Sequence, residues 1–421
     1  MIPVEEAFRR ILDRTPRLPA ETVGLEAARG RVLREDVFAD RDLPPFHRSA
    51  VDGYAVRAAC LSGGGRLRVV DQIPAGTMPK VRVGPGEAAA IMTGAPLPEG
   101  ADAAIMVEDT VRDGDFVVWP APGRTPPPVR PGNRVTARGA EVPRGAKLLE
   151  AGVRISPAGI GLLATVGKVR VEVARRPRIA VFSTGDELRH PRTATPRPAE
   201  IRDANSHLIA VRCRALGLPV RRLGFAADDP DHLASKVAAG LAADVLFISG
   251  GVSMGRYDYV EPVLERAGVR LLVTAVAIRP GKPFVFGVTR DAPPVLVFGL
   301  PGNPVSALTT FEVLARPALD AMQGIADPRP PCPSVRLLAP VTARGPRRAF
   351  LPARVGVADD GALAAQPIRS QGSGDIAAVA LANALVIVPE DQETVPAGAS
   401  VAAQPLPGFP DAGAGWHDPR Q

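Results

Sequence analysis

The chain has 421 residues, of which 46% are hydrophobic and 23% charged, so it is long enough to bury the cores of several domains. Its net charge of +7 is dispersed without long basic runs, which weighs against a nucleic-acid-binding protein. Three widely spaced cysteines argue against a disulfide framework or zinc site, and no apolar stretch approaches the roughly 20 residues that span a bilayer. We therefore expect a cytoplasmic protein that binds neither nucleic acid nor membranes.

The N-terminal third of the chain predicts two kinds of structure. Residues 1–40 predict a helix and then a short strand, because Val4 and Ile11 belong to a set of apolar residues at helical spacing. Residues 41–131 contain short β-like runs separated by Gly and Pro turns, which is typical of a small β-domain. The Pro-rich stretch Pro120–Pro131 closes this part.

The remaining segments predict an α/β domain followed by a second β-unit. Residues 132–175 predict a helix and a strand, and residues 176–325 alternate strands and helices as a parallel sheet requires. The Pro-rich break Asp327–Pro333 precedes a C-terminal β-type unit that runs to about Leu406, and residues 407–421 form a loose tail.

One sequence pattern occurs three times between Arg178 and Ala307: an apolar run typical of a β-strand, followed by a Gly-rich polar turn. The turns are Ser183–Glu187, Ser249–Gly255 and Gly299–Ser306. Because ligands of open α/β sheets bind at the carboxyl ends of the strands, the three turns predict one composite site for an anionic, phosphate-bearing ligand.

The turn Ser249–Ser253 is the best candidate anion cradle. Paired glycines, Gly250 and Gly251, let the backbone approach a ligand closely and point N–H groups at oxyanions. The alternative is an ordinary strand-to-helix turn. Asp258 follows closely, either as a helix N-cap or as a carboxylate facing the cradle.

Four further carboxylates, Asp186, Glu187, Asp203 and Asp228, lie beyond predicted strand ends. Mg²⁺ prefers oxygen ligands and typically takes one or two carboxylates together with substrate phosphates. Each residue alone could equally cap a helix or solvate a loop. Their convergence on one sheet edge favours a magnesium site.

Two rigid turns complete the candidate site. Arg279 and Lys282 flank a Pro-Gly pair, and such a fixed pair of cations could hold a phosphate or a molybdate-like oxyanion; otherwise it is a solvated surface turn. Pro301 and Pro304 stiffen the third polar turn, which is either a pre-organised wall or a plain connector.

Asp52 and Thr93 lie in two earlier glycine turns, which by themselves predict only turn formation. With the segments above they complete six ordered blocks: Ala50–Ala55, Ile91–Pro96, Phe182–Leu188, Ser249–Ser253, Arg279–Pro283 and Gly299–Ser306. In this order, over about residues 1–405, the blocks resemble the molybdopterin molybdenumtransferase family, which includes the C-terminal domain of gephyrin.

The resemblance implies a multidomain α/β plus β fold and an elongated homodimer. The parts it implies are a discontinuous N-terminal domain (1–40 and 132–175), an inserted β-domain (41–131), a molybdopterin-binding α/β domain with a mostly parallel sheet (176–325), a C-terminal β-barrel (326–406) and a tail (407–421). The family's active site lies between subunits, which would bring Asp52 and Thr93 to the α/β domain of the other chain.

The resemblance also implies the reaction: molybdate is inserted into adenylyl-molybdopterin with release of AMP, in the presence of Mg²⁺. An adenylyltransferase would supply the substrate. The implied catalytic residues are Asp52, Thr93, Glu187, Asp228 and Asp258. The implied metal ligands are Asp186, Glu187, Asp228 and Asp258. The implied substrate-binding residues are Ser183, Thr184, Gly185, Asp203, Ser249, Gly250, Gly251, Ser253, Arg279, Lys282, Pro301, Pro304 and Ser373.

Two alternatives stay open at this point. A molybdopterin adenylyltransferase shares the α/β domain but is usually a short, single-domain chain. A non-catalytic scaffold of the same fold is the other. The sequence does not distinguish molybdate from tungstate as the oxyanion. Arg279 stands where Lys is common, which keeps the charge but changes its geometry.

Overall fold

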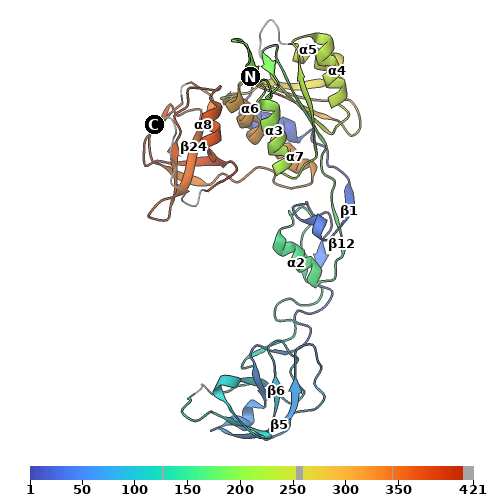
Figure 1. The fold of residues 1–421 in the computed structure, drawn as a ribbon, viewed down its shortest axis with the longest axis vertical. Coiled ribbons are helices and arrows are strands. Elements are labelled where there is room, and N and C mark those ends of the chain that lie inside the picture. Colours follow the sequence, from blue (N-terminus) through green and yellow to red (C-terminus); the bar gives the residue numbers. More distant parts are fainter. Residues whose placement is uncertain (126–127, 253–258, 344, 411–421) are drawn as a thin grey trace.

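The computed structural model describes residues 1–125, 128–252, 259–343 and 345–410. The chain forms an elongated, curved molecule: an α/β domain and a C-terminal barrel lie side by side at one end, and a small β-domain lies at the other (Figure 1). A narrow middle part joins the two ends. The expected fold class, α/β plus β in several domains, is what the structure shows.

The α/β domain is built on a six-stranded sheet. Its strands, in spatial order, are β16 (Val220–Ala226), β13 (Ile179–Thr184), β17 (Val245–Ser249), β21 (Leu296–Leu300), β20 (Pro283–Val288) and β18 (Arg270–Ala275). The first four strands are mutually parallel, whereas β20 and β18 run antiparallel to their neighbours, so the sheet is mostly parallel. Its central strands read as continuous apolar runs because both faces are covered by helices.

The two faces of this sheet are covered by different helices. One face packs on α4 (Pro230–Gly240) and α5 (Val260–Arg266). The opposite face carries α1 (Val4–Leu12), α3 (Asn205–Ala215), α6 (Pro304–Thr310), the π-helical turn η4 (Phe311–Ala315) and α7 (Arg316–Met322).

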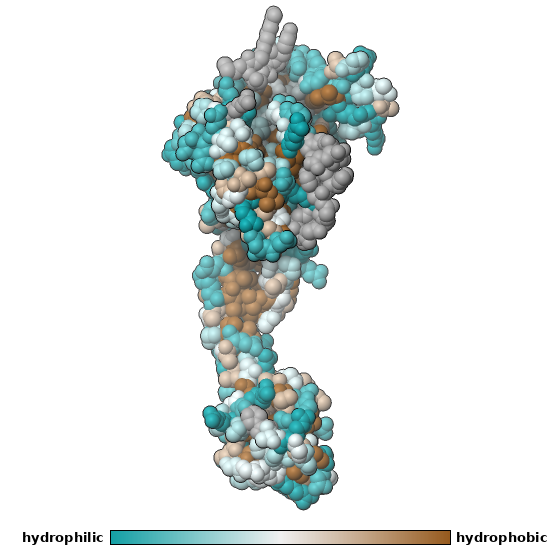
Figure 2. Space-filling view, turned by 90° about the vertical axis from the view of Figure 1, so that its left-hand side faces the viewer, coloured by the Kyte–Doolittle hydropathy of each residue, from teal (hydrophilic) through white to brown (hydrophobic). Residues whose placement is uncertain are grey.

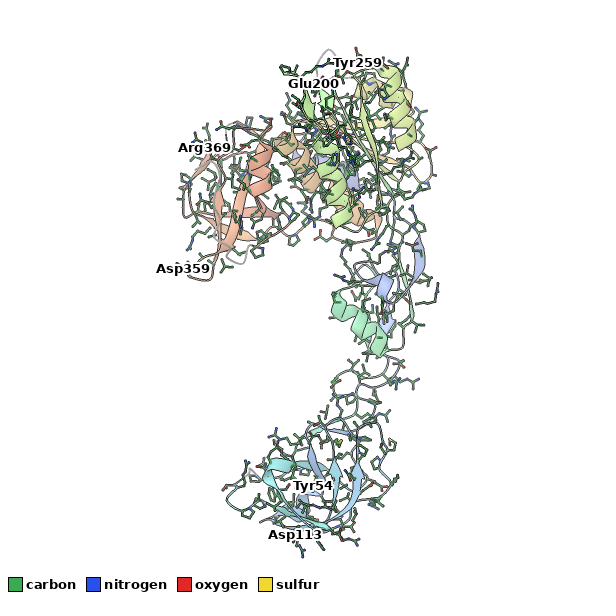
Figure 3. All side chains as sticks on the ribbon, viewed as in Figure 1. Tyr54, Asp113, Glu200, Tyr259, Asp359 and Arg369 are labelled. Carbon is green, nitrogen blue, oxygen red and sulfur yellow. The ribbon has the colours of Figure 1, made fainter. Side chains whose placement is uncertain are left out.

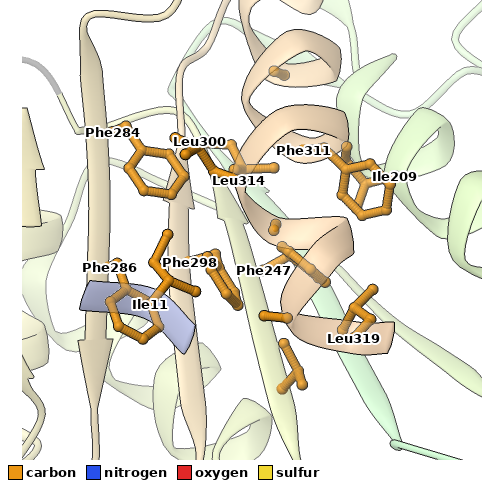
Figure 4. Packing of buried hydrophobic residues seen from close by; sticks show 14 of the residues in the cluster. Ile11, Ile209, Phe247, Phe284, Phe286, Phe298, Leu300, Phe311, Leu314 and Leu319 are labelled. Atoms are coloured by element: carbon orange, nitrogen blue, oxygen red, sulfur yellow. The ribbon is translucent and has the colours of Figure 1, made fainter. Parts of the chain in front are cut away.

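Aromatic rings fill the core on this second face (Figure 4). The ring of Phe298 lies 5.3 Å from that of Phe247 and 5.1 Å from that of Phe286, and all three side chains are fully buried. Ile11 of α1 belongs to the same cluster. The N-terminal helix therefore packs into the α/β domain, while the strand that follows it lies in the middle part; the domain boundaries given above stay a prediction.

The middle part is a small unit made of two distant segments of the chain. Its elements are β1 (Ala20–Gly24) paired with β12 (Arg170–Ala174), β2 (Val37–Phe38) paired with β11 (Lys147–Leu149), the turn η1 (Glu26–Ala28) and helix α2 (Pro157–Thr165). Ser156 caps α2 by accepting a hydrogen bond from the Gly159 N–H. An ion pair of 2.7 Å between Arg154 and Asp320 ties this unit to α7.

The β-domain at the far end is a curled half-barrel sheet. Its strands, in spatial order, are β7 (Ala103–Met106), β4 (Gly53–Val56), β6 (Glu87–Ile91), β5 (Gly65–Ile73), β9 (Phe116–Trp119) and β8 (Val111–Asp113). Short elements around it are β3 (Arg48–Ser49) paired with β10 (Val135–Thr136), and the turns η2 (Ala58–Leu61) and η3 (Val107–Asp109).

The C-terminal domain is a closed barrel, because β24 pairs with both β25 and β26. Its strands are β24 (Arg348–Val357), β25 (Leu363–Pro367), β22 (Ser334–Leu337), β28 (Ser400–Pro405) and β26 (Ala384–Val388). Other elements are β23 (Val341–Thr342) paired with β27 (Thr394–Val395), helix α8 (Ile376–Leu381) and, in the α/β domain, β14 (Leu188–Arg189) paired with β15 (Ile201–Arg202).

The α/β domain and the barrel are joined directly. Strand β19 (Ile278–Arg279), which follows the α/β sheet strand β18, pairs with β24 of the barrel. Glu5 of α1 forms ion pairs of 2.7 Å with both Arg329 and Arg348. Within the described residues, no helix combines the length and apolar character needed to cross a membrane.

Candidate functional site

A cleft of about 510 Å³ lies at the carboxyl ends of the parallel strands. Ser183 at the end of β13 is in register with Ser249 at the end of β17, which is in register with Leu300 of β21, so the three polar turns begin at the same level. The predicted residues that line this cleft are Ser183, Thr184, Gly185, Glu187, Asp203, Asp228, Ser249, Gly250, Gly251, Pro301 and Pro304.

The paired glycines of the second turn are required by its conformation. Gly250 and Gly251 have φ angles of 97° and 62°, a region that disfavours other residues. A Cβ on Gly250 would collide with the Thr184 carbonyl oxygen, and one on Gly251 would lie 2.8 Å from the Val260 side chain. The backbone of the Ser249 turn therefore packs directly against the end of β13 and against Val260, which leaves no room for a side chain at either glycine.

Buried polar side chains form the floor of the cleft. Asp203, only 3% exposed, accepts a hydrogen bond of 2.8 Å from the Ser183 hydroxyl. The same carboxylate accepts from the Ser206 N–H at 3.1 Å, and Arg222 lies 3.9 Å away. Asp203 therefore orients the Ser183 hydroxyl. The Asp203 carboxylate already accepts hydrogen bonds from protein groups when no ligand is bound.

Asn205, which is absent from the predicted site residues, joins two of the turns. Its side-chain amide donates to the Ser249 hydroxyl at 2.9 Å and to the Gly302 carbonyl at 2.6 Å. The Ser249 hydroxyl donates onward to the Pro301 carbonyl at 3.1 Å. The amide cannot be flipped, since the Gly302 carbonyl only accepts, and Asn205 Oδ1 is left buried without a partner. The one sequence signal was a polar residue at the start of a helix beside Asp203.

The turns that contain Asp186 and Asp228 are joined by hydrogen bonds at the edge of the cleft. Together with Glu187 we call them the acidic lip. The Asp228 N–H donates to the Asp186 carboxylate at 3.0 Å, and the Asp186 N–H donates to the Asp228 carboxylate at 3.4 Å. The Thr184 hydroxyl also donates to Asp228, at 3.1 Å. The neighbouring Glu187 folds back over Gly185, where a Cβ would collide with its carboxylate. Asp186 is the one carboxylate of this set that does not line the cleft.

This donor set fits a magnesium ion that is shared with a substrate. Among the described residues, no group of three or more His, Cys, Asp or Glu side chains could hold a metal by itself. Mg²⁺ commonly takes one or two carboxylates and completes its shell with phosphate and water. Glu187 and Asp228, both at the cleft, offer such a pair.

A second cleft, of about 730 Å³, adjoins the first and is lined by cations. Glu187 and Pro301 border both clefts. Arg279 and Lys282 contribute from the α/β domain, and Arg347, which sequence reasoning missed, contributes from the barrel. Nothing local in the sequence marks Arg347, because the pairing of β19 with β24 is what brings it to this cleft.

Ser373 connects the barrel to the third turn. Asn303 donates from its side-chain amide to the Ser373 hydroxyl at 2.9 Å, and the Val305 N–H donates to the Ser373 carbonyl at 3.1 Å. Ser373 lines the second cleft. The wall containing Pro301 and Pro304 is thus held from the α/β side by Asn205 and from the barrel side by Ser373.

Asp52 and Thr93 form a pair of their own, far from both clefts of the same chain. Asp52 accepts hydrogen bonds from the Thr93 N–H at 2.7 Å and from its hydroxyl at 3.0 Å. The N–H bond first, and the hydroxyl bond second, hold the pKa of Asp52 below its usual range. Figure 3 shows the distance: Tyr54, next to this pair in sequence, lies at the opposite end of the molecule from Tyr259.

Two predicted residues, Ser253 and Asp258, lie outside the described residues. For the others, the structure brings together the anion cradle, the acidic lip and the cationic turn, and it separates Asp52 and Thr93 from them. The arrangement suits a ligand with a phosphate chain in the first cleft and a small oxyanion in the second.

Comparison with known protein families gives three matches in chain order. Residues 2–167 match the MoeA N-terminal region (domain I and II), and residues 180–321 match a probable molybdopterin binding domain. Residues 334–406 match the MoeA C-terminal region (domain IV).

Whole proteins and solved structures match over nearly the full length. A molybdopterin molybdenumtransferase from Nostoc sp. is 33% identical over 415 residues, covering 96% of this chain and 94% of the relative. One from Staphylococcus aureus (strain COL) is 33% identical over 407 residues, covering 95% of this chain and 94% of the relative. The crystal structure of the molybdopterin biosynthesis moeA protein from Pyrococcus horikoshii OT3 has a TM-score of 0.81 at 28% identity, covering 96% of this chain and 100% of that one.

The role of Asn205 can be tested with the isosteric change Asn205→Asp. A carboxylate cannot donate to the Gly302 carbonyl, so we expect a loss of about 1–3 kcal/mol in the free energy of unfolding. We also expect faster amide hydrogen exchange in the peptide containing residues 299–306. Denaturant unfolding and exchange mass spectrometry measure the two effects.

Asn383 provides the matched control. It is a buried asparagine of the barrel whose amide donates to the Val355 carbonyl at 2.9 Å and the Gly408 carbonyl at 3.2 Å. Asn383→Asp should cost similar stability and leave exchange at 299–306 unchanged. Equal exchange in both variants would contradict a positioning role for Asn205.

The Asp52 pair predicts a titration shift. Thr93→Val removes the hydroxyl donor and keeps the N–H donor, so the pKa of Asp52 should rise toward its usual value without reaching it. NMR titration of the Asp52 carboxyl carbon would measure the shift. An unchanged pKa would show that the hydroxyl contributes nothing to the ionised form.

Proposed function

The chain belongs to the molybdopterin molybdenumtransferase family, and we propose that its two adjoining clefts transfer molybdenum from molybdate to adenylyl-molybdopterin with release of AMP. The observation that carries this proposal is the contact between an acidic, glycine-rich cleft and a cationic one, with Glu187 and Pro301 bordering both. The reaction needs a nucleotide pyrophosphate and an oxyanion side by side, and the two clefts offer a place for each.

The first cleft suits the pyrophosphate of the substrate. Gly250 and Gly251 line this cleft and carry no side chains, so a phosphate can approach the backbone of their turn closely. Ser183 lies beside this turn, and its hydroxyl donates a hydrogen bond to Asp203, so it presents an acceptor oxygen to the cleft. This oxygen and the carboxylates at the cleft favour a phosphate chain that arrives with a bound cation.

The second cleft suits a tetrahedral dianion. Arg279, Lys282 and Arg347 line it from two domains, and the hydroxyl of Ser373 lines it as well. Charge-assisted hydrogen bonds contribute about 1.5–3 kcal/mol each, so three or four suffice for micromolar binding. Molybdate and tungstate have the same charge and shape, and the cleft does not separate them.

Glu187 and Asp228 would hold a Mg²⁺ ion together with the substrate phosphates. Bound there, the ion would neutralise pyrophosphate charge and act as a Lewis acid for its cleavage. The reciprocal hydrogen bonds between the Asp186 and Asp228 turns keep the Asp228 carboxylate at the lip. Because the protein supplies only part of the coordination shell, we expect Mg²⁺ to bind tightly only with nucleotide present.

We propose a homodimer in which Asp52 and Thr93 complete the site of the partner subunit. Helix α2 carries no charged residue, and Leu162 on it and the nearby Val169 are at least partly exposed. Figure 2 shows the apolar surface that results on the middle part, on the side toward which the molecule curves. A two-fold arrangement through this surface would cover it and place the half-barrel of one chain near the clefts of the other.

The geometry favours metal insertion over the alternative of adenylyl transfer. The cationic cleft is completed by Arg347 and Ser373, which belong to the barrel, so the α/β domain alone would lack this part of the wall. A separate adenylyltransferase would supply the adenylylated substrate. Cys60, Cys213 and Cys332 are unpaired, in keeping with a reducing, cytoplasmic setting.

The proposal predicts molybdate-dependent release of AMP. The protein should release AMP from adenylyl-molybdopterin when both Mg²⁺ and molybdate are present. Glu187→Gln should reduce the rate at least tenfold, which corresponds to a loss of about 1.4 kcal/mol in the stabilisation of the transition state. Chromatography of AMP measures the rate. Release that does not depend on molybdate or tungstate would refute the proposal.

The dimer proposal predicts complementation between two inactive variants. Asp52→Asn and Asp228→Asn should each abolish activity, but a mixed dimer retains one intact site if Asp52 acts across subunits. Random mixing should then restore about one quarter of the activity of the unaltered protein, since half of the dimers are mixed and each has one good site. Mixtures without activity would show that the two residues act within one chain.

A further inference from the structure

Two large apolar side chains at the mouth of the first cleft are exposed. Ile201 of β15 is 56% exposed, and Ile376 at the start of α8 is 42% exposed. Both line the first cleft, and Ile201 also lines the second. One side chain belongs to the α/β domain and the other to the barrel, so the two domains each bring an aliphatic surface to the same opening.

These two exposed apolar side chains differ from the side chains in the floor of the first cleft, which are polar and buried. This floor is made of buried polar side chains joined in hydrogen-bonded pairs, Asp203 with Ser183 and Asn205 with Ser249. Isolated exposed aliphatic residues are common on protein surfaces. Here two from separate domains border one polar cleft, which is the usual composition of a site for a ligand with an apolar face and polar groups.

The barrel residue is held near the cleft by hydrogen bonds already described. Ser373, three residues before Ile376, accepts from the Asn303 amide at 2.9 Å and from the Val305 N–H at 3.1 Å. Asn303 belongs to the wall shared by the two clefts. The segment carrying Ile376 is thus tied to the same turn that faces the phosphate-binding glycines.

We propose that Ile201 and Ile376 are substrate-binding residues that hold a flat heteroaromatic ring of the substrate at the mouth of the cleft. The proposal rests on the proposed function, because adenylyl-molybdopterin carries a nitrogen-containing ring system at each end: adenine, and a pterin whose pyrimidine ring is flat. Burying the two aliphatic side chains against a ring removes apolar surface from water on both partners. The phosphates attached to the ring can then reach Gly250 and Gly251 in the same cleft.

Direct binding measurements test whether Ile201 and Ile376 hold a ring, which we call the isoleucine clamp, and they do not require the metal-transfer reaction. Isothermal titration of the full-length protein with AMP, and separately with neopterin as a free pterin, gives Kd values for each ring. Ile201→Ala and Ile376→Ala should each weaken one of these ligands by about tenfold, since truncation to Ala removes most of the apolar surface that the ring would cover. The ligand that is weakened identifies the ring.

Two variants control for the loss of exposed apolar surface in general. Val211 of α3 is 58% exposed and Val357 of β24 is 61% exposed, and neither is among the described residues that line the first or the second cleft. Val211→Ala and Val357→Ala should leave both Kd values unchanged. Thermal unfolding of all four variants verifies that each remains folded.

The outcomes separate this inference from the proposed function. Weaker binding of AMP or neopterin by both isoleucine variants supports the clamp, even if molybdate-dependent AMP release is never observed. Kd values for both ligands that match those of the valine controls would overturn it. Failure of the unaltered protein to bind either ring would overturn it as well, whatever the outcome of the AMP-release assay.

Discussion

The site depends on the register of three parallel strands. Ser183 pairs with Ser249, and Ser249 pairs with Leu300, so β13, β17 and β21 end at one level and their turns meet. A shift of one residue in any strand would exchange the side chains that face the two helical layers and move its turn away from the others. Each layer packs against its own set of buried side chains, so such an exchange would disrupt both cores.

The buried polar side chains beneath these turns lower the stability of the fold, and their arrangement indicates a role in holding a ligand. Asp203 is a nearly buried carboxylate, and Asn205 keeps one acceptor buried without a partner. An unsatisfied buried polar atom costs about 1–3 kcal/mol. The packed rings around Phe298 and the apolar helices on both faces offset that cost. Stability therefore comes from the body of the sheet, and its end is left free to hold polar groups where a ligand needs them.

The sequence predicted those parts whose determinants are local. A short apolar run and a glycine turn suffice to recognise β17 and the cradle after it, and the order of such blocks indicates the family. The role of Asn205, the arrival of Arg347 through the β19–β24 pairing, and the packing of α1 into the α/β core all depend on contacts between residues far apart in the chain. Local patterns in one sequence do not reveal which distant residues will be in contact, so these features appear only in the folded protein.

The α/β domain places opposite charges at one cleft without joining them. Glu187 and Lys282 both border the second cleft, yet the ion pairs within the described residues include none between them. Carboxylates and cations on one flexible loop would neutralise each other and leave nothing for a ligand. Here the acidic lip is fixed by the Asp186–Asp228 hydrogen bonds, while the cationic wall is fixed by a rigid Pro-Gly turn and by the barrel. Because the acidic and cationic groups are held separately, each stays available to a ligand: the carboxylates to a cation that accompanies a phosphate chain, and the cations to an oxyanion.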